Sequence, residues 1–433
     1  MVASVALPLD HPQRVELNDE VHARPPESLI APVRLTFLAL YSDWTLRERQ
    51  WSHAADLARR FGIVPPPPGA NHFSADLGPF RLKWERHTEF VRYMFIVGSV
   101  GDDPFDGSAI ASVPADWLAT LPGQTMVATH VALIRDDGSW KQPEVLAARH
   151  FGGNPLIGAA IGGGSATAVT DFRIHVDGFS RLLIHDRNLT PRQAGRMVQR
   201  LMEIDIYRLM ALLALPVARE LAPYLSAREA ELSEITAALA DSRLASEPEL
   251  LQRLTLLEAA VGKRGADSHY RFSAATAYYE LVERRIDELR EGRIHGLQTF
   301  REFTERRLAP AMQTCRAVAA RLESLSGRAA RTTQLLSTRV DIARQGQNQA
   351  LLAAMNRRGE LQLRLQQTVE GLSVAAITYY VVGLVGYAAK ALRTSGLAID
   401  ADLAVGLSVP IVALLAAFGI RRIRHAVTQG PTP

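Results

Sequence analysis

Two short polar clusters in the N-terminal half of the chain carry residue types that do chemistry. In the first, residues 18–26, carboxylates, an imidazole and a guanidinium lie within seven residues, and two prolines follow. Its candidate ligand-binding residues are Asp19, Glu20, His22 and Arg24. An arginine in such a loop binds phosphate, and neighbouring carboxylates bind a cation. The ordinary alternative is a loop that holds its own shape through local hydrogen bonds.

The second cluster is residues 84–89, whose candidate ligand-binding residues are Glu85, Arg86, His87 and Glu89. If the segment is a strand, His87 and Glu89 share one face, and Arg86 lies on the other. Two such groups on one face serve as ligands or as an acid–base pair. The ordinary alternative is a solvated face or an ion pair. Neither cluster is specific enough to name a reaction.

The known catalytic motifs are missing from the sequence. It has no phosphate-binding loop with its lysine, no Gly-x-Ser-x-Gly elbow and no His-Glu-x-x-His zinc helix. The glycine-rich segment 158–165 lacks dinucleotide-binding spacing and reads either as an anion cradle or as a turn before a strand. The sequence therefore predicts no catalytic residue, no metal site and no cofactor, and it favours a binding protein over an enzyme.

Composition excludes further classes. The formal net charge is +4, and the sequence shows no clustered basic face of the kind that binds nucleic acid. Cys315 is the only cysteine, so neither an intrachain disulfide nor a cysteine metal cluster is possible. Charged and polar residues at Asp10, His11 and Arg14 come too early for a signal peptide, so we expect no cleaved leader.

Residues 1–222 are expected to form a cytoplasmic α+β domain that positions both clusters. The strand candidates are residues 33–41, 127–134, 172–176 and 179–185, the last two flanking an Asp177–Gly178 hairpin turn. A helix is expected from Trp44 to just before Gly62. A second should begin at Thr190 with a capping box and end or bend at Pro216.

Residues 223–370 are expected to be helical and coiled-coil-like. Ser226 and Ser246 each begin a capping-box spacing, and Tyr279, Val282 and Ile286 recur at heptad-like intervals. Such helices pack lengthwise on one another or on a second copy of the chain. After Gly327 one helix on the order of 90 Å long is expected to enter the first apolar run. The polar patch at residues 345–349 is interpreted either as a solvated break or as a layer that fixes register.

Two uncharged 18-residue runs, 372–389 and 403–420, follow near the C-terminus. Each would span about 27 Å as a helix, close to the roughly 30 Å of a bilayer's hydrocarbon core. Buried core helices are the alternative. Because the runs are paired and have basic residues at their ends, we expect a transmembrane hairpin over residues 371–420.

Basic residues also predict its orientation. Arg357, Arg358 and Arg364 precede the first run, and a basic tail of residues 421–433 follows the second, which places both termini in the cytoplasm. The first run contains hydroxyl side chains that either line a pore or pack against the second helix. The candidate pore-lining residues are Ser373, Thr378, Tyr380 and Tyr387.

Residues 15–26, 80–90, 203–219 and 347–389 resemble a bacterial family of membrane-anchored proteins, domain of unknown function 3422. The most specific stretch is residues 349–380, and the resemblance covers nearly the whole chain. It implies the inner membrane of Gram-negative bacteria and brings no established activity. The layout is also similar to that of CorA-type magnesium channels. Those channels place Gly-Met-Asn at the outer end of the first span, where this chain has Gly386-Tyr387-Ala388.

The sequence leads to three hypotheses about the function of the protein. The leading hypothesis is a membrane-anchored, homo-oligomeric protein that self-associates through its helical middle and binds a ligand or partner in the cytoplasm. The first alternative is a divergent CorA-like channel or transporter. The second is a membrane-tethered enzyme, which requires the two polar clusters to meet in one cleft. The sequence identifies neither the ligand nor the stoichiometry.

Overall fold

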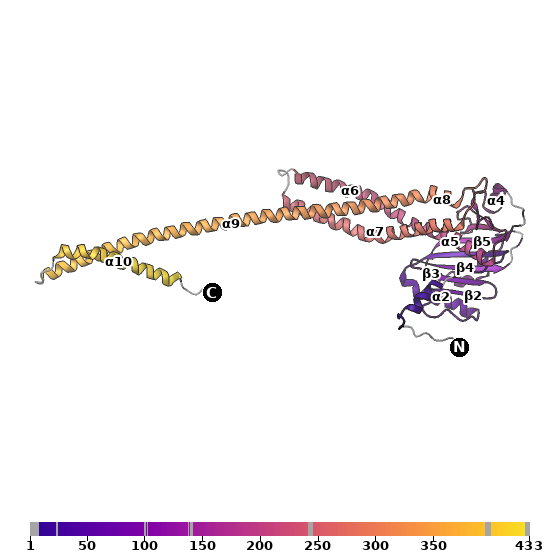
Figure 1. The fold of residues 1–433 in the computed structure, drawn as a ribbon, viewed down its shortest axis with the longest axis horizontal. Helices are drawn as coiled ribbons and strands as arrows, with labels where there is room; N and C mark the ends of the chain where they lie inside the picture. The colour runs from indigo at the N-terminus through magenta and orange to yellow at the C-terminus, as the bar shows by residue number, and fades with distance from the viewer. Residues whose placement is uncertain are drawn as a thin grey trace. The chain divides into compact units, whose positions relative to one another are not determined.

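The computed structural model describes residues 8–22, 25–98, 101, 103–136, 138, 142–240, 246–394 and 400–428. The chain forms two compact units, Met1–Thr333 and Gln334–Pro433. The first unit contains a mixed sheet and several helices, and the second is helical (Figure 1). The expected division at residues 222 and 370 remains a prediction.

The sheet of the first unit has eight strands in the order β2-β3-β4-β1-β5-β8-β7-β6. Neighbouring strands pair antiparallel except β5 and β8, which are parallel. The strands are β1 (Val33–Tyr41), β2 (His72–Asp76), β3 (Arg81–Arg86), β4 (Phe90–Gly98), β5 (Gln124–Arg135), β6 (Ile157–Ile161), β7 (Ala166–Thr170) and β8 (Ser180–Asp186). The α+β prediction for the N-terminal region is confirmed.

Strand β1 has the predicted bounds, and β5 contains the predicted strand 127–134. The predicted hairpin at Asp177–Gly178 is wrong, because residues 172–176 form no strand and β8 pairs instead with β7. The side chains of Thr170 and Asp171 accept hydrogen bonds from the backbone N–H groups of Phe172 and Arg173. Those groups are thereby satisfied locally, and the pairing of β7 ends at Thr170.

One face of the sheet packs on α2 (Arg47–Arg60), the 3-10 turn η2 (Ala109–Ser112) and α3 (Ala115–Leu118). The helix predicted from Trp44 is confirmed, with a 3-10 turn, η1 (Trp44–Leu46), as its start and Gly62 at φ +70° just past its end. The core between these layers is aromatic and aliphatic. Its central side chains are Leu57, Leu82, Trp84, Tyr93, Phe95 and Trp117.

The other face carries α5 (Pro191–Leu212), which begins with the predicted capping box at Thr190. Helix α5 ends four residues before Pro216, because a proline ring blocks the carbonyl of the fourth residue before it. Helix α6 (Ala214–Ala240) then starts at once. The helix start predicted at Ser226 is wrong. Ser226 lies inside α6, where its hydroxyl donates to the Ala222 carbonyl instead of capping a new helix.

Helices α6, α7 (Glu247–Leu289) and the beginning of α9 (Ala309–Thr394) pack on one another. Ser246 is the N-cap of α7 as predicted, although its side chain makes no capping bond. The heptad-spaced residues Tyr279, Val282 and Ile286 are buried. The heptad pattern of α7 is thus satisfied by packing within one chain.

The remaining elements of the first unit are short. They are α1 (Arg14–His22), α4 (Pro143–His150) and α8 (Phe300–Arg307). The segment after α7 covers the free edge of β6, where Ala160 and Gly292 exchange backbone hydrogen bonds and the Gly158 N–H donates to the Gln298 carbonyl. Covering an edge in this way prevents it from pairing with another sheet.

In the second unit, α9 continues to Thr394 and α10 runs over Ala401–Thr428. Helix α9 continues through the polar patch at residues 345–349, as expected for one long helix, and every residue of the patch is exposed, as expected for a solvated interruption of the apolar pattern. The two helices are long and apolar enough to cross a membrane, and only 6% and 0% of their most apolar windows are buried. They approach closely at Gly386, where an added Cβ would lie 3.1 Å from Cγ2 of Val405.

Candidate functional site

Of the first polar cluster, Asp19 lies on α1 and is exposed, 3.5 Å from the amide nitrogen of Asn18. The side chains of Glu20 and His22, and the whole of Arg24, lie outside the described residues. The carbonyl of Pro25, just beyond them, accepts a 2.5 Å hydrogen bond from Lys83 on β3. The chain that leaves this cluster is therefore attached to the strand that leads into the second cluster.

The second cluster is only partly a strand. Strand β3 ends at Arg86, and the His87 N–H donates to the Phe90 carbonyl to close a turn into β4. The expectation that His87 and Glu89 share a strand face is therefore wrong. Glu85 and Arg86 point to opposite faces of the sheet, as adjacent strand residues must. The four candidates consequently divide between two different environments.

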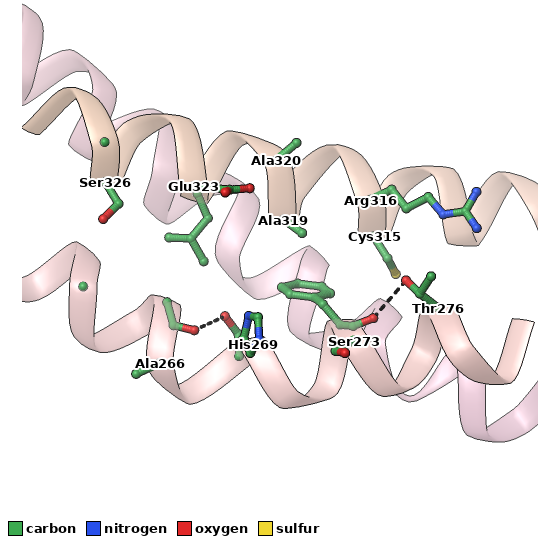
Figure 2. Close-up of a pocket in the computed structure, with 16 residues that line it drawn as sticks. Ala266, His269, Ser273, Thr276, Cys315, Arg316, Ala319, Ala320, Glu323 and Ser326 are labelled. Carbon is green, nitrogen blue, oxygen red and sulfur yellow. Dashed lines mark hydrogen bonds between the residues drawn. The ribbon is translucent and has the colours of Figure 1, made fainter.

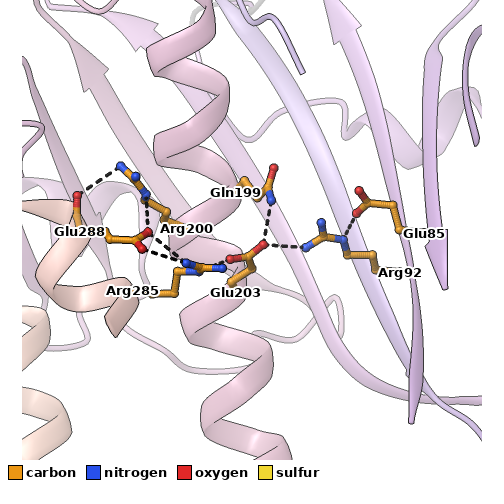
Figure 3. Close-up of polar contacts among 7 residues, drawn as sticks. All are labelled: Glu85, Arg92, Gln199, Arg200, Glu203, Arg285 and Glu288. Atoms are coloured by element: carbon orange, nitrogen blue, oxygen red, sulfur yellow. Dashed lines mark hydrogen bonds and ion pairs between the residues drawn. The ribbon is translucent and has the colours of Figure 1, made fainter. Parts of the chain in front are cut away.

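Glu85 belongs to a buried ion-pair network between the sheet, α5 and α7 (Figure 3). Its carboxylate pairs with Arg92 on β4 and lies 3.3 Å from Nζ of Lys83. Arg92 also reaches Glu203 on α5 at 3.3 Å. Glu203 in turn pairs with Arg285 on α7. Arg285 lies 3.0 Å from Glu288, and Glu288 lies 2.9 Å from Arg200. Charges alternate along the network.

The network keeps Glu85 and Arg92 ionised. Burial would raise the pKa of Glu85, but Arg92 and Lys83 outweigh it and hold that pKa below its usual value. Burial would lower the pKa of Arg92, whereas Glu85 and Glu203 raise it above the usual range. A carboxylate held this firmly is a poor proton carrier. The network therefore joins α5 and α7 to the sheet through ion pairs.

Sequence reasoning missed Arg92, Glu203 and Arg285 because they come from three elements far apart in the chain. The sequence did contain an indication of these buried charges. Arg92 interrupts the apolar strand 90–98, and Glu203 and Asp205 interrupt the apolar face of α5, where both are buried. A buried charge inside an apolar run needs a partner. Asp205 finds its partners in Thr129 on β5 at 3.1 Å and in Arg208 at 2.5 Å.

Arg86 lines a second environment, a polar cavity of about 370 Å³ at the β3–β4 turn, which we call the Arg86 cavity. Its guanidinium donates to the side-chain oxygen of Asn71 at 2.9 Å and to the backbone carbonyl of Arg47 at 2.9 Å. His87 also lines this cavity. Glu89 does not line it and forms a largely buried ion pair with Arg271 on α7.

A larger hollow of about 820 Å³, the α7–α9 groove, lies between α7 and the beginning of α9 (Figure 2). It exists because small side chains face each other there, among them Ala266, Ala319 and Ser326. The Thr276 hydroxyl donates back to the Phe272 carbonyl. Burial raises the pKa of the Cys315 thiol, which keeps it in the unreactive protonated form. The Cys315 thiol therefore gives the groove no reactive nucleophile.

The candidate pore-lining residues lie on the apolar part of α9. Thr378, Tyr380 and Tyr387 line a hollow between α9 and α10, and Ser373 lines a neighbouring one. The hydroxyls of Ser373 and Thr378 donate to the carbonyls of Val369 and Val374 in their own helix, at 2.8 and 2.7 Å. Within the described residues, no group of three or more histidine, cysteine or acidic side chains is placed to hold a metal ion.

Comparison with known proteins agrees with the resemblance found in the sequence. The family model described as "Protein of unknown function (DUF3422)" matches residues 9–427, nearly the whole chain. No curated protein matches the sequence. The family description carries no activity, ligand or partner, and it leaves the similarity to CorA-type channels unconfirmed. The chain belongs to the DUF3422 family.

Proposed function

We propose that this protein is a membrane-anchored scaffold that self-associates and presents its N-terminal unit to a ligand or partner, without being an enzyme. The observation that carries the proposal is the exposure of apolar side chains on α9 and α10. Leu372, Leu414 and Phe418 are 74%, 72% and 66% exposed. Contiguous apolar surface of this extent is rare on soluble proteins and marks a surface that lipid or protein covers.

The two apolar runs are proposed to form a transmembrane hairpin. Their lengths suit a bilayer, and Gly386 permits the close approach to Val405 that a tightly packed pair requires. Basic residues are more numerous on one side of the hairpin, at Arg357 and Arg358 before it and at Arg421 after it, than in the loop between the runs, where Asp400 and Asp402 offset Lys390 and Arg393. The positive-inside rule assigns both ends to the cytoplasm, and the family resemblance suggests the bacterial inner membrane.

Fractionation and labelling test the anchor and its orientation. The full chain should remain in the membrane pellet after alkaline carbonate washing and dissolve in detergent. In a Cys315→Ala background, Asp400→Cys should react with a membrane-impermeant maleimide added to spheroplasts. Gly346→Cys should react only after lysis. Release by carbonate contradicts the anchor, and the reverse labelling pattern contradicts the orientation alone.

Self-association is proposed for residues 334–370 of α9, with a second copy of this chain as the partner. Leu351, Met355, Leu365 and Val369 lie on one stripe of the helix at about 100° per residue, and each is at least 56% exposed. Anchors in the same membrane hold these helices parallel and at the same height, which is the arrangement that a parallel coiled coil requires.

Light scattering of the detergent-solubilised protein tests self-association. The expected result is a dimer or larger assembly that dissociates in the variant Leu351→Gln/Met355→Gln/Leu365→Gln. Leu363→Gln is the matched control, because Leu363 is equally exposed but lies off the stripe. A wild-type monomer, or dissociation by the control alone, contradicts the proposal.

Ion transport and catalysis remain the less favoured alternatives. The hydroxyls of Ser373 and Thr378 already donate to their own helix, and the outer end of the first run carries Gly386-Tyr387-Ala388. Flux of divalent or monovalent ions through proteoliposomes that contain the purified protein would overturn this preference.

A further inference from the structure

Three lysine or arginine side chains are buried in the described part of the chain, and they differ in how their charge is balanced. Lys83, Arg86 and Arg92 are 6%, 7% and 4% exposed. Lys83 and Arg92 pair with carboxylates of the ion-pair network. Arg86 forms no ion pair with any described carboxylate. Leaving a buried charge without a counter-charge is costly, so Arg86 calls for a separate explanation.

The hydrogen bonds of Arg86 fix its position without neutralising it. Its Nε and Nη2 donate to the side-chain oxygen of Asn71, its Nη2 to the Gly69 carbonyl at 3.3 Å and its Nη1 to the Arg47 carbonyl. All these acceptors are uncharged. One of the five guanidinium N–H bonds, on Nη1, donates to no residue that the structure describes, and Arg86 lines the cavity. A guanidinium held in this way is preorganised to receive an anion.

The other lining side chains point to the same chemistry. The cavity is lined by two arginines, Arg47 and Arg86, and by no carboxylate. The phenols of Tyr207 on α5 and Tyr278 on α7 also line it, and their rings stack at 5.7 Å. No described residue forms a hydrogen bond with either hydroxyl, so each can donate into the cavity. Burial and the neighbouring charge of Arg47 lower the pKa of Arg86, and the exposed carboxylate of Glu48 opposes them without forming an ion pair with Arg86.

We infer that the Arg86 cavity binds the phosphate monoester group of a small molecule or lipid. Two guanidinium groups balance a doubly charged phosphate better than a singly charged carboxylate, and the planar fork of arginine matches phosphate oxygens. A volume of about 370 Å³ exceeds that of one phosphate, and Phe90 and Leu281 supply apolar wall for the rest of the ligand. The inference deepens the ligand-binding role proposed for the N-terminal unit and does not depend on the anchor.

Binding of inorganic phosphate to the full chain in a non-ionic detergent tests the inference. The experiment is equilibrium dialysis with radiolabelled phosphate at constant ionic strength, with chloride as the compensating ion, because salt screens weak electrostatic attraction. Saturable binding is expected. Tyr278→Phe should weaken it about tenfold, since it removes one hydrogen bond to a charged group. Arg47→Gln should weaken it up to about fivefold.

The variants are chosen so that misfolding does not imitate lost binding. Arg47 is exposed, and the hydrogen bond that its backbone carbonyl accepts survives a side-chain change. Arg49→Gln is the matched control, because Arg49 is exposed on the same helix and does not line the cavity. Arg86→Lys keeps the charge but loses the fork, and it should bind more weakly than wild type. Circular dichroism confirms that each variant is folded.

Nanodiscs distinguish the two sources of the phosphate group. If phosphatidic acid in the disc, whose phosphate is a monoester, competes with free phosphate and zwitterionic phospholipid does not, the ligand is a lipid headgroup. If neither competes, the ligand is soluble. The inference is overturned if phosphate does not bind saturably in any of these preparations, or if Arg47→Gln and Tyr278→Phe bind as tightly as wild type. Either failure leaves carbonate extraction and light scattering unchanged, so it is separable from failure of the proposed function.

Discussion

Glu203 is the centre of the buried ion-pair network, and replacing it with glutamine gives the sharpest test of what the network does. The substitution keeps the size of the side chain and removes its charge. Arg92 and Arg285 then each lose one carboxylate and keep another, Glu85 for Arg92 and Glu288 for Arg285. The perturbation is therefore purely electrostatic at a site where the Glu203 side chain is only 5% exposed.

The expected cost follows from burial. Removing one partner of a buried ion pair typically costs about 3–5 kcal/mol of unfolding free energy. Because both arginines keep one partner, we expect the lower end, about 3 kcal/mol. Glu288→Gln is the matched control. Its side chain is 32% exposed, so solvent screens the pair and the loss should stay below about 1 kcal/mol.

Urea unfolding of the purified protein, followed by tryptophan fluorescence, measures both variants. Trp84 and Trp117 are buried in the core on the opposite face of the sheet, so their emission reports unfolding of this unit. For an m-value near 3 kcal/mol/M, the Glu203→Gln midpoint should fall by about 1 M. If Glu203→Gln costs no more than Glu288→Gln, the network does not hold α5 to the sheet and the reasoning fails.

Three further predictions concern other parts of the chain. Burial lowers the pKa of His130 to about 4 in the folded protein. As the pH falls below about 6.5, His130 therefore takes up a proton in the unfolded chain before it does so in the folded protein. The first unit should lose up to about 3 kcal/mol between pH 6.5 and 4, and His130→Gln should flatten that pH profile of urea midpoints. Gly195→Ala should cost about 3 kcal/mol or more in urea unfolding, because its Cβ would lie 1.6 Å from the Glu27 carbonyl oxygen. Gly262→Ala, which meets nothing within 4 Å, should gain about 0.5–1 kcal/mol. Gly386→Leu should lower the melting temperature in detergent, whereas Gly383→Leu, which also meets nothing within 4 Å, should leave it unchanged.

Several elements defined by local pattern were predictable from the sequence, although the capping-box spacing at Ser226 lies inside α6, and elements defined by distant partners were not predictable. The bounds of β1 and the cap at Thr190 depend on a few adjacent residues, and both predictions are confirmed. The Asp177–Gly178 turn also exists, with the Gly178 N–H donating to the His175 carbonyl. The pairing of β8 depends on residues far apart in the sequence, and the turn residues alone do not determine it.

The candidate site shows the same division. Residues 84–89 were identified as a candidate ligand-binding cluster because several polar and charged residues are close together there in the sequence. In the structure, Glu85 and Arg86 are both buried. Their separation onto opposite faces follows from the strand period. The partners that decide their roles, Glu203 and Tyr207 on α5 and Tyr278 on α7, come from over a hundred residues away, and no local spacing indicated them.

The network and the Arg86 cavity are physically linked through α5, where Glu203 and Tyr207 lie one helical turn apart. Burial, aided by the charge of Glu203, raises the pKa of Tyr207 to about 12, and burial raises that of Tyr278 to about 12. Both phenols therefore stay protonated, and remain donors, far above neutral pH. The arginines stay charged over the same range.

This linkage predicts how phosphate binding responds to alkaline pH. Inorganic phosphate is almost entirely a dianion above about pH 8.5, since its second pKa is about 7. With the ligand, the arginines and the phenols all constant, affinity should be flat from about pH 8.5 to 10 at fixed ionic strength. Phenols with the ordinary pKa near 10 would ionise in the upper part of that range and repel the ligand. A fall in affinity between pH 8.5 and 10 that Tyr278→Phe abolishes would show that the phenols are not held protonated by the packing of α5 and α7 on the sheet.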